Sequence, residues 1–115
     1  MNPLPTFRIR DVEMLTIQEP GNCLDPIDVL FLDHDPGRGR LIVRCYSMAW
    51  TAWWGAMGDE NTVRTFVRKT DAAYIANCLL YGPGDLQRAR ARKLQAAYVE
   101  RIVTAIKLAL LGDAP

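Results

Sequence analysis

Apolar and polar residues alternate along the first half of the chain. The alternation opens the segment 6–17 and runs through 40–46, where Leu41, Val43 and Cys45 occupy every second position. A period of two is typical of a strand with one buried face. Strands are therefore predicted over 6–17, 27–32 and 40–46, the second from an apolar run between turn residues and the other two from alternation.

A short loop separates the second and third of these strands. Asp35, Pro36 and Gly37 lie in it, with proline at the second position of the turn and glycine at the third. This order is typical of a type II turn. The loop therefore predicts a β-hairpin that joins 27–32 to 40–46.

All three tryptophans fall in the segment 47–54, which fits two structures. Trp50, Trp53 and Trp54 have the spacing of one helix face, yet the same segment also allows strand alternation. The β-propensity of tryptophan and threonine, and continuity with the preceding strand, favour a fourth strand.

The second half of the chain has helical spacing. A short helix is expected after Gly58 with Asp59 or Asn61 as its cap, and a second after Thr70 and Asp71. The last and longest is expected over 86–111, with Asp85 as its cap and Gly112 at its end.

Strands followed by helices predict an α+β fold in a single domain, 1–115. We expect a small antiparallel sheet of three or four strands in the N-terminal half. It would pack against C-terminal helices, the last one long.

Composition narrows the class of protein. The chain has 115 residues, a net charge of +1 and 50% hydrophobic residues, as expected for one globular domain without a strong overall attraction to nucleic acid or anionic membranes. The sequence has no long apolar run and begins without a basic-then-apolar leader pattern, so we expect a cytoplasmic protein that does not enter the membrane.

The residues that could carry chemistry are few. Three cysteines without CxxC spacing do not suggest a disulfide framework, and His34, between Asp33 and Asp35, is a weak basis for a metal site. We therefore expect no catalytic residues, no metal and no cofactor.

The tryptophans are the first candidate site. Trp50, Trp53 and Trp54 could form the core or a protein-binding surface. They could also stack on nucleic-acid bases while nearby arginines contact phosphates. Those arginines are Arg38, Arg40 and Arg44.

The last helix is the second candidate. Its beginning carries Arg88, Arg90, Arg92 and Lys93. Positive charge near a helix N-terminus opposes the macrodipole, so these residues do not stabilise the helix. Their presence instead favours a basic patch that binds phosphate or an acidic protein surface. A solvated face is the other interpretation. The apolar second half of the helix indicates deep burial or a homodimer through this helix.

One stretch is distinctive enough to suggest a family. It comprises the Gly-Arg-Gly-Arg turn at 37–40, Cys45 and Tyr46, and the run from Ala49 to Gly58. It resembles a group of small uncharacterised proteins encoded by bacteriophages and prophages, which share these features and a basic C-terminal helix. This chain has Ser47 where that group leads us to expect glycine. The resemblance implies a phage accessory protein and no particular activity.

Together these observations predict a non-enzymatic phage accessory protein that binds a host protein, in an anti-defence or regulatory role. The first alternative is a nucleic-acid-binding module that uses the arginine-rich hairpin and the basic helix. The second is a small enzyme or ligand-binding protein with a pocket beside Trp50, Tyr46 and Cys45.

Overall fold

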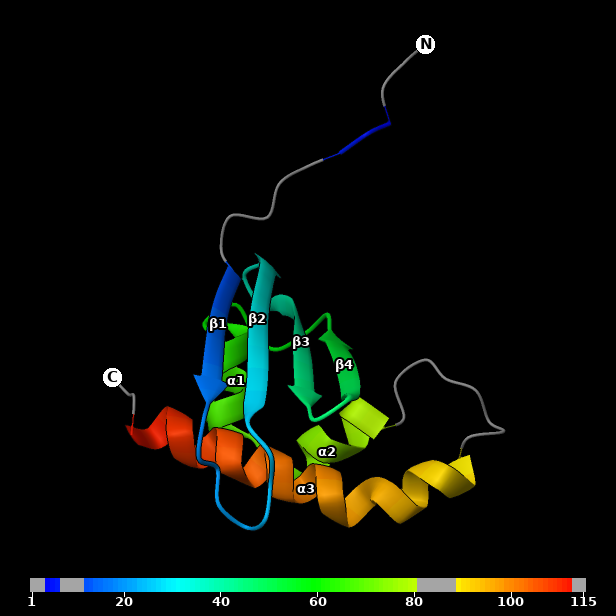
Figure 1. Cartoon of the computed structure of the whole chain (residues 1–115). Helices are drawn as coiled ribbons and strands as arrows, with labels where there is room; N and C mark the ends of the chain where they lie inside the picture. Colours follow the sequence, from blue (N-terminus) through cyan, green and yellow to red (C-terminus); the bar gives the residue numbers. More distant parts are fainter. Residues whose placement is uncertain (1–3, 7–11, 81–88, 113–115) are drawn as a thin grey trace.

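A computed structural model describes residues 4–6, 12–80 and 89–112, with side chains in the last range from position 95 onward. It has a four-stranded antiparallel sheet followed by three helices, which confirms the α+β prediction (Figure 1). The strands are β1 Val12–Ile17, β2 Ile27–Asp35, β3 Arg38–Cys45 and β4 Met48–Trp54. The helices are α1 Val63–Lys69, α2 Ala72–Leu80 and α3 Ala89–Gly112.

The sheet is a meander in which each strand pairs with the next, in the order β1-β2-β3-β4. The predicted hairpin joins β2 to β3, and Gly37 has the positive φ of 75° that a type II turn requires at its third position. The register shifts between Asp33 and Asp35, so His34 is the extra residue of a β-bulge. The predicted first strand is described from Val12 onward, and positions 7–11 lie outside the described residues.

The tryptophan segment is a strand, as the sequence favoured. Cys45 pairs with Met48 across a turn of two residues, so these two residues lie on the same face and the buried positions of β4 are the even-numbered ones. Trp50 and Trp54 are therefore directed to the helices, each with 8% of its surface exposed. Trp53 points to the opposite face and is 45% exposed.

The three helices lie on one side of the sheet (Figure 1). Helix α1 packs on β2 and β3, α2 packs on β4, and α3 lies against α2 and α1. Between them is one continuous apolar core, to which alternate strand residues and the apolar faces of the helices contribute. Its fully buried members include Phe31, Leu41, Ile75, Ile102 and Ile106.

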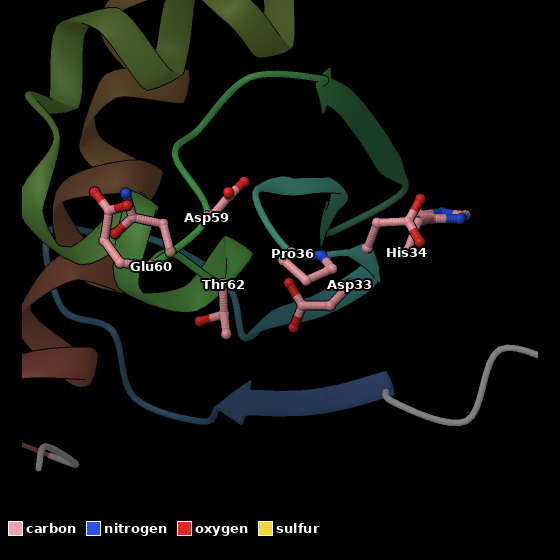
Figure 2. A pocket seen from close by; sticks show the side chains of 8 residues that line it. Asp33, His34, Pro36, Asp59, Glu60 and Thr62 are labelled. Carbon is pink, nitrogen blue, oxygen red and sulfur yellow. The ribbon is translucent and has the colours of Figure 1, made fainter.

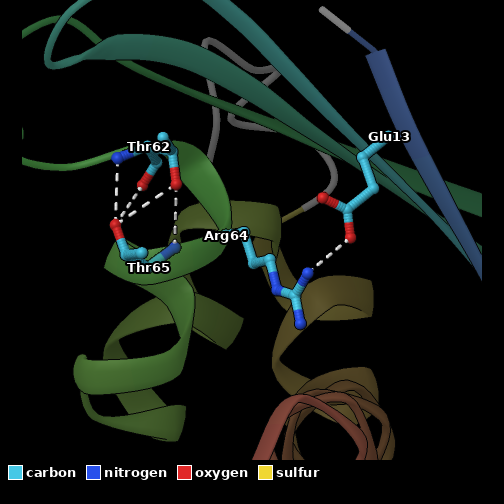
Figure 3. Close-up of polar contacts among 4 residues, drawn as sticks. All are labelled: Glu13, Thr62, Arg64 and Thr65. Carbon is cyan, nitrogen blue, oxygen red and sulfur yellow. Dashed lines mark hydrogen bonds and ion pairs between the residues drawn. The ribbon is translucent and has the colours of Figure 1, made fainter. Parts of the chain in front are cut away.

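Helix α1 is capped by Thr62 and not by Asp59 or Asn61, the two residues that the sequence suggested. Thr62 and Thr65 bond reciprocally through side chain and backbone in a capping box (Figure 3). Asn61 has another role: its buried amide donates to the backbone oxygen of Met57 at 2.6 Å. Arg64 on the same helix donates to Glu13 of β1 at 3.0 Å, which ties α1 to the edge of the sheet (Figure 3).

The glycines of the distinctive motif bring the β2–β3 hairpin against the loop that follows β4. The backbone N–H of Met57 donates a hydrogen bond to the backbone oxygen of Gly37 at 2.8 Å. A Cβ at position 37 would lie 2.8 Å from the backbone oxygen of Gly58, closer than real contacts allow. Gly37 therefore permits this close backbone approach, while Gly58 adopts a positive φ of 95°.

Helix α3 ends at Gly112, as expected, whereas its predicted cap Asp85 lies outside the described residues. Its apolar half is deeply buried, with Val99, Ile102 and Ile106 fully covered. None of the helices in the described ranges combines the length and apolar character needed to cross a bilayer.

Candidate functional site

One face of the sheet has no helix packed on it among the described elements (Figure 1). The strand registers arrange its side chains in three rows across the sheet. The rows are Val12-Leu32-Arg40-Trp53, Met14-Leu30-Ile42-Thr51 and Thr16-Asp28-Arg44-Ala49. We call these residues the open face.

The centre of the open face is apolar. Met14 is 60% exposed, and Leu30 and Ile42 beside it are half-buried. Residues on a solvated sheet face are ordinarily polar. A contiguous apolar patch with a polar rim is typical of an interaction site.

Arg40 and Trp53 form one side of this rim. The Arg40 guanidinium donates to Thr51 Oγ1 at 3.1 Å, and its central carbon lies 5.8 Å from the centre of the Trp53 ring. His34, in the bulge, meets the same indole edge-on with ring centres 5.1 Å apart. These contacts fix a half-exposed indole next to a cation, and tryptophan and arginine are the residues enriched at binding hot spots.

The opposite rim is nearly neutral. Asp28 accepts a hydrogen bond from Thr16 Oγ1 at 3.0 Å and forms an ion pair with Arg44 at 3.8 Å. The charge of Arg44 is therefore balanced on the surface itself. Arg38 extends the same face to the tip of the hairpin, where it pairs with Asp35 at 3.8 Å.

The structure divides the three predicted tryptophans between two roles. Trp50 packs on Tyr98 of α3, with ring centres 6.1 Å apart, and Trp54 packs on Phe66 of α1 at 5.2 Å. Both are core residues, so the part of the binding-site prediction that concerns them is replaced by a structural role. Trp53 remains available at the surface.

The basic-helix prediction stays a prediction. Arg90, Arg92 and Lys93 belong to the first turns of α3, but their side chains, and Arg88 altogether, lie outside the described residues. The dimer through this helix also stays untested. Burial within the chain accounts for most of the apolar positions that suggested it, while Leu108 and Leu111 are exposed.

An acidic hollow lies at the end of the sheet where β2 turns into β3 (Figure 2). Its volume is about 430 Å³, and its walls include Asp33, His34, Asp35, Asp59 and Glu60. Asp33 is already engaged, because its Oδ1 accepts from the backbone N–H of Val63 at 2.7 Å and so helps to begin α1. Within the described part of the chain, no cluster of three or more histidine, cysteine or acidic side chains could hold a metal ion.

The residues proposed to flank a ligand pocket are separated. Cys45 and Trp50 are buried in the core, where the Tyr98 hydroxyl donates to Cys45 Sγ at 3.4 Å. This hydrogen bond is the main cause that raises the pKa of Tyr98 to about 12. Tyr46 is 71% exposed and lines a shallow hollow with Asp25 and Arg44.

The sequence reasoning missed the contribution of β1 and β2 to the open face. From the sequence, Met14, Leu30 and Leu32 are assigned only to the strands expected over 6–17 and 27–32. A signal was present, because the run from Ile27 to Leu32 is apolar at positions of both parities. A strand with two apolar faces, in a sheet covered on one side only, leaves one apolar face outward.

The comparisons with known proteins agree with the resemblance. No curated protein and no solved structure matches the chain. The model of a protein family described as a phage family, Phage_phiTE_072, matches residues 7–109, which is nearly the whole chain. A match of this extent covers the sheet, the open face and most of α3, and the chain therefore belongs to this phage family.

Proposed function

We propose that this phage protein is a non-enzymatic accessory protein that acts in the host cytoplasm by binding a host protein through its open face. The observation that carries the proposal is the apolar row Met14-Leu30-Ile42, with Met14 exposed and the other two half-buried, beside the Arg40–Trp53 pair. We expect a target in nucleic-acid metabolism or antiviral defence, so that binding has an anti-defence or regulatory effect.

The chemistry of the open face favours a protein partner. Interfaces between proteins have an apolar centre, a polar rim and aromatic or arginine anchors. The open face has each of these, and the acid Asp28 lies among its basic residues. A surface that binds phosphate groups has a higher affinity when it carries an excess of positive charge, and Asp28 reduces that excess.

Affinity capture from host lysate tests the proposal first. The tagged protein is incubated with lysate treated with nuclease, and the bound proteins are identified by mass spectrometry. The partner is then purified, and its affinity is measured by calorimetry for the wild-type protein and for Met14→Glu. We expect Met14→Glu to weaken binding by about tenfold or more, which corresponds to about 1.4 kcal/mol.

Leu108→Glu provides the matched control. Leu108 is 64% exposed on α3, close to the 60% of Met14, so the two substitutions add the same charge at equal exposure on different surfaces. Thermal unfolding should show both variants folded. A partner that loses affinity with Leu108→Glu and keeps it with Met14→Glu would contradict the open face as the binding surface.

Nucleic acid is the second candidate, favoured by one observation. Trp53 is half-exposed with the Arg40 cation at its ring, an arrangement that could stack a base and contact its phosphate. Binding of single-stranded oligonucleotides would be followed by fluorescence anisotropy at several salt concentrations. A steep loss of affinity with salt, together with loss of binding in Trp53→Ala, would replace the protein partner by nucleic acid.

A further inference from the structure

Among the residues that the structure describes, the edge strand β4 lacks the usual protection against pairing with another strand. From Cys45 to Gly58 the sequence has no charged residue and no proline. Within the described residues, β3 is the one strand paired with β4. Natural sheets ordinarily block such edges with charges, prolines, bulges or a covering segment.

The opposite edge of the sheet is different. Strand β1 carries Glu13, which is held by Arg64 of α1 at 3.0 Å (Figure 3). A charge at an edge discourages a second strand from approaching. The contrast between the two edges singles out β4 as the strand available for pairing.

The hairpin register shows which backbone groups of β4 do not bond β3. In a hairpin with a loop of two residues, the flanking residues exchange hydrogen bonds, and here these are Cys45 and Met48. Every second residue from Met48 therefore bonds β3. The N–H and C=O groups of the intervening residues point to the outer edge, and these residues are Ala49, Thr51 and Trp53.

We propose that β4 pairs antiparallel with β4 of a second copy of this chain, about a two-fold axis at Thr51. Strand β4 has seven residues and Thr51 is its midpoint, so this register aligns the full length of both strands. The outward groups of Ala49, Thr51 and Trp53 would then form about six backbone hydrogen bonds with the other copy. The two sheets would join into one, with both open faces on the same side.

The side chains of β4 fit this register. Trp53 would lie across from Ala49 of the second copy, so each indole meets a small residue. On the buried side Trp50 would lie across from Ala52 of the second copy, and Trp54 across from Met48. No indole faces another indole in either row, and the two-fold axis falls on a Thr-Thr pair, which is a favourable cross-strand pair.

Other registers are worse. The outward backbone groups of the two strands also meet when the axis falls on another residue of β4. An axis at Trp50 would put the two copies of Trp50 opposite each other, and an axis at Ala52 would put Trp54 across from Trp50 of the second copy. An axis at Trp53 would put two indoles directly opposite each other and shorten the paired length. An axis at Ala49 would bring the turn residue Ser47 across from Thr51 of the second copy and leave Trp54 beyond the paired segment.

Charge complementation at the axis tests the proposal. Thr51→Lys and Thr51→Glu each place two like charges opposite one another, which destabilises a strand pair. Sedimentation velocity should show a wild-type dimer across micromolar concentrations. Each variant alone should self-associate at least about tenfold more weakly. Mixing the two variants should restore a dimer, because the lysine of one copy then faces the glutamate of the other.

Restoration on mixing also shows that both variants are folded. Thr51→Val is the matched control that keeps the size of the side chain and adds no charge, and it should remain dimeric. Leu108→Lys and Leu111→Lys test the α3 surface and should leave the dimer intact. A monomeric wild-type protein overturns the proposal. A dimer that survives both Thr51 charges, or one that the α3 substitutions dissociate, overturns it equally.

Discussion

Gly39 of β3 lies directly against Val63, the first residue of α1. A Cβ at position 39 would collide with Val63 Cγ2 and would lie 2.6 Å from the backbone oxygen of Leu32. The absence of a side chain at Gly39 thus lets α1 begin on the sheet. The Gly-Arg-Gly turn, which is part of the distinctive motif, therefore has a packing role at its second glycine.

Gly39→Ala should destabilise the fold. The added methyl group would press on the backbone of β2 as well as on Val63, so relaxation of one side chain cannot remove the clash. We expect a loss of about 1–3 kcal/mol in the free energy of unfolding, measured by urea denaturation. Gly112→Ala is the control, because a Cβ there has no neighbour among the described atoms within 4 Å. Equal stability of the two variants would contradict the close contact.

The β3–β4 turn should respond to glycine at one position only. Tyr46 has a φ of 59°, while Ser47 is not among the residues with positive φ. This pattern is that of a type II′ turn, which prefers glycine at its first central position. Tyr46→Gly should therefore be neutral or stabilise the fold by up to about 1 kcal/mol.

Ser47→Gly is the comparison for that turn, since glycine is the residue that the family resemblance led us to expect there. It removes no strain and adds conformational freedom to the unfolded chain, so we expect it to destabilise by about 0.5 kcal/mol. Thermal unfolding of both variants under the same conditions shows which of the two is the more stable. If Ser47→Gly proved the more stable, the turn would have another geometry.

Lys107 should contribute strongly to stability. Its Nζ donates to the backbone oxygens of Val67 at 3.2 Å and Arg68 at 2.8 Å, and also to that of Thr70. These are the terminal carbonyls of α1, where a cation also favours the helix dipole. We expect Lys107→Met to lower the free energy of unfolding by about 2 kcal/mol.

The control for Lys107 is Lys69→Met. Lys69 is exposed in the last turn of α1, so its loss should change stability by no more than about 0.5 kcal/mol. Chemical denaturation followed by tryptophan fluorescence measures both. A small effect of Lys107→Met would mean that water replaces the ammonium group at these carbonyls.

Tyr98 should ionise late and make stability depend on alkaline pH. The hydrogen bond to Cys45, with burial, raises its pKa from 10.0 to about 12. The folded state therefore retains this proton at pH values where the unfolded state has lost it. The resulting stabilisation is complete below pH 10 and is lost as pH rises toward 12. Ultraviolet titration of the phenolate band measures the pKa.

Two variants test whether the hydrogen bond to Cys45 causes the raised pKa of Tyr98. Cys45→Ala removes the hydrogen-bond partner and should move the pKa of Tyr98 back toward 10.0. Tyr98→Phe should abolish the ionisation with a pKa of about 12 and its contribution to the pH dependence of stability. A late step that persists in Tyr98→Phe would assign it to another tyrosine.

The order of elements and the α+β class could be predicted because the signals are local. Alternation in 40–46 and the Pro36-Gly37 turn depend on neighbouring residues alone. The faces to which the β4 side chains point could also be predicted. The two residues that flank a two-residue turn lie on the same face, so Cys45 on the buried side implies Met48, Trp50 and Trp54 there and Trp53 outside.

The remaining differences come from contacts between distant residues. Asn61 is as good a cap as Thr62 by residue type, but its amide is used by Met57 and its side chain is buried. Asp33 of β2 accepts a hydrogen bond from the backbone N–H of Val63 at the start of α1, and the two residues are 30 positions apart in the sequence. Local residue types do not report such partners. The open face likewise depends on which side of the sheet the helices cover.

The alternation of the strands has an evolutionary consequence. Positions 29, 31, 41 and 43 hold the core, whereas 30 and 42 face outward in the same two strands. Substitutions in the second set leave the first untouched. A phage lineage under pressure from a changing host can therefore diversify one side of this sheet while inheriting the other intact.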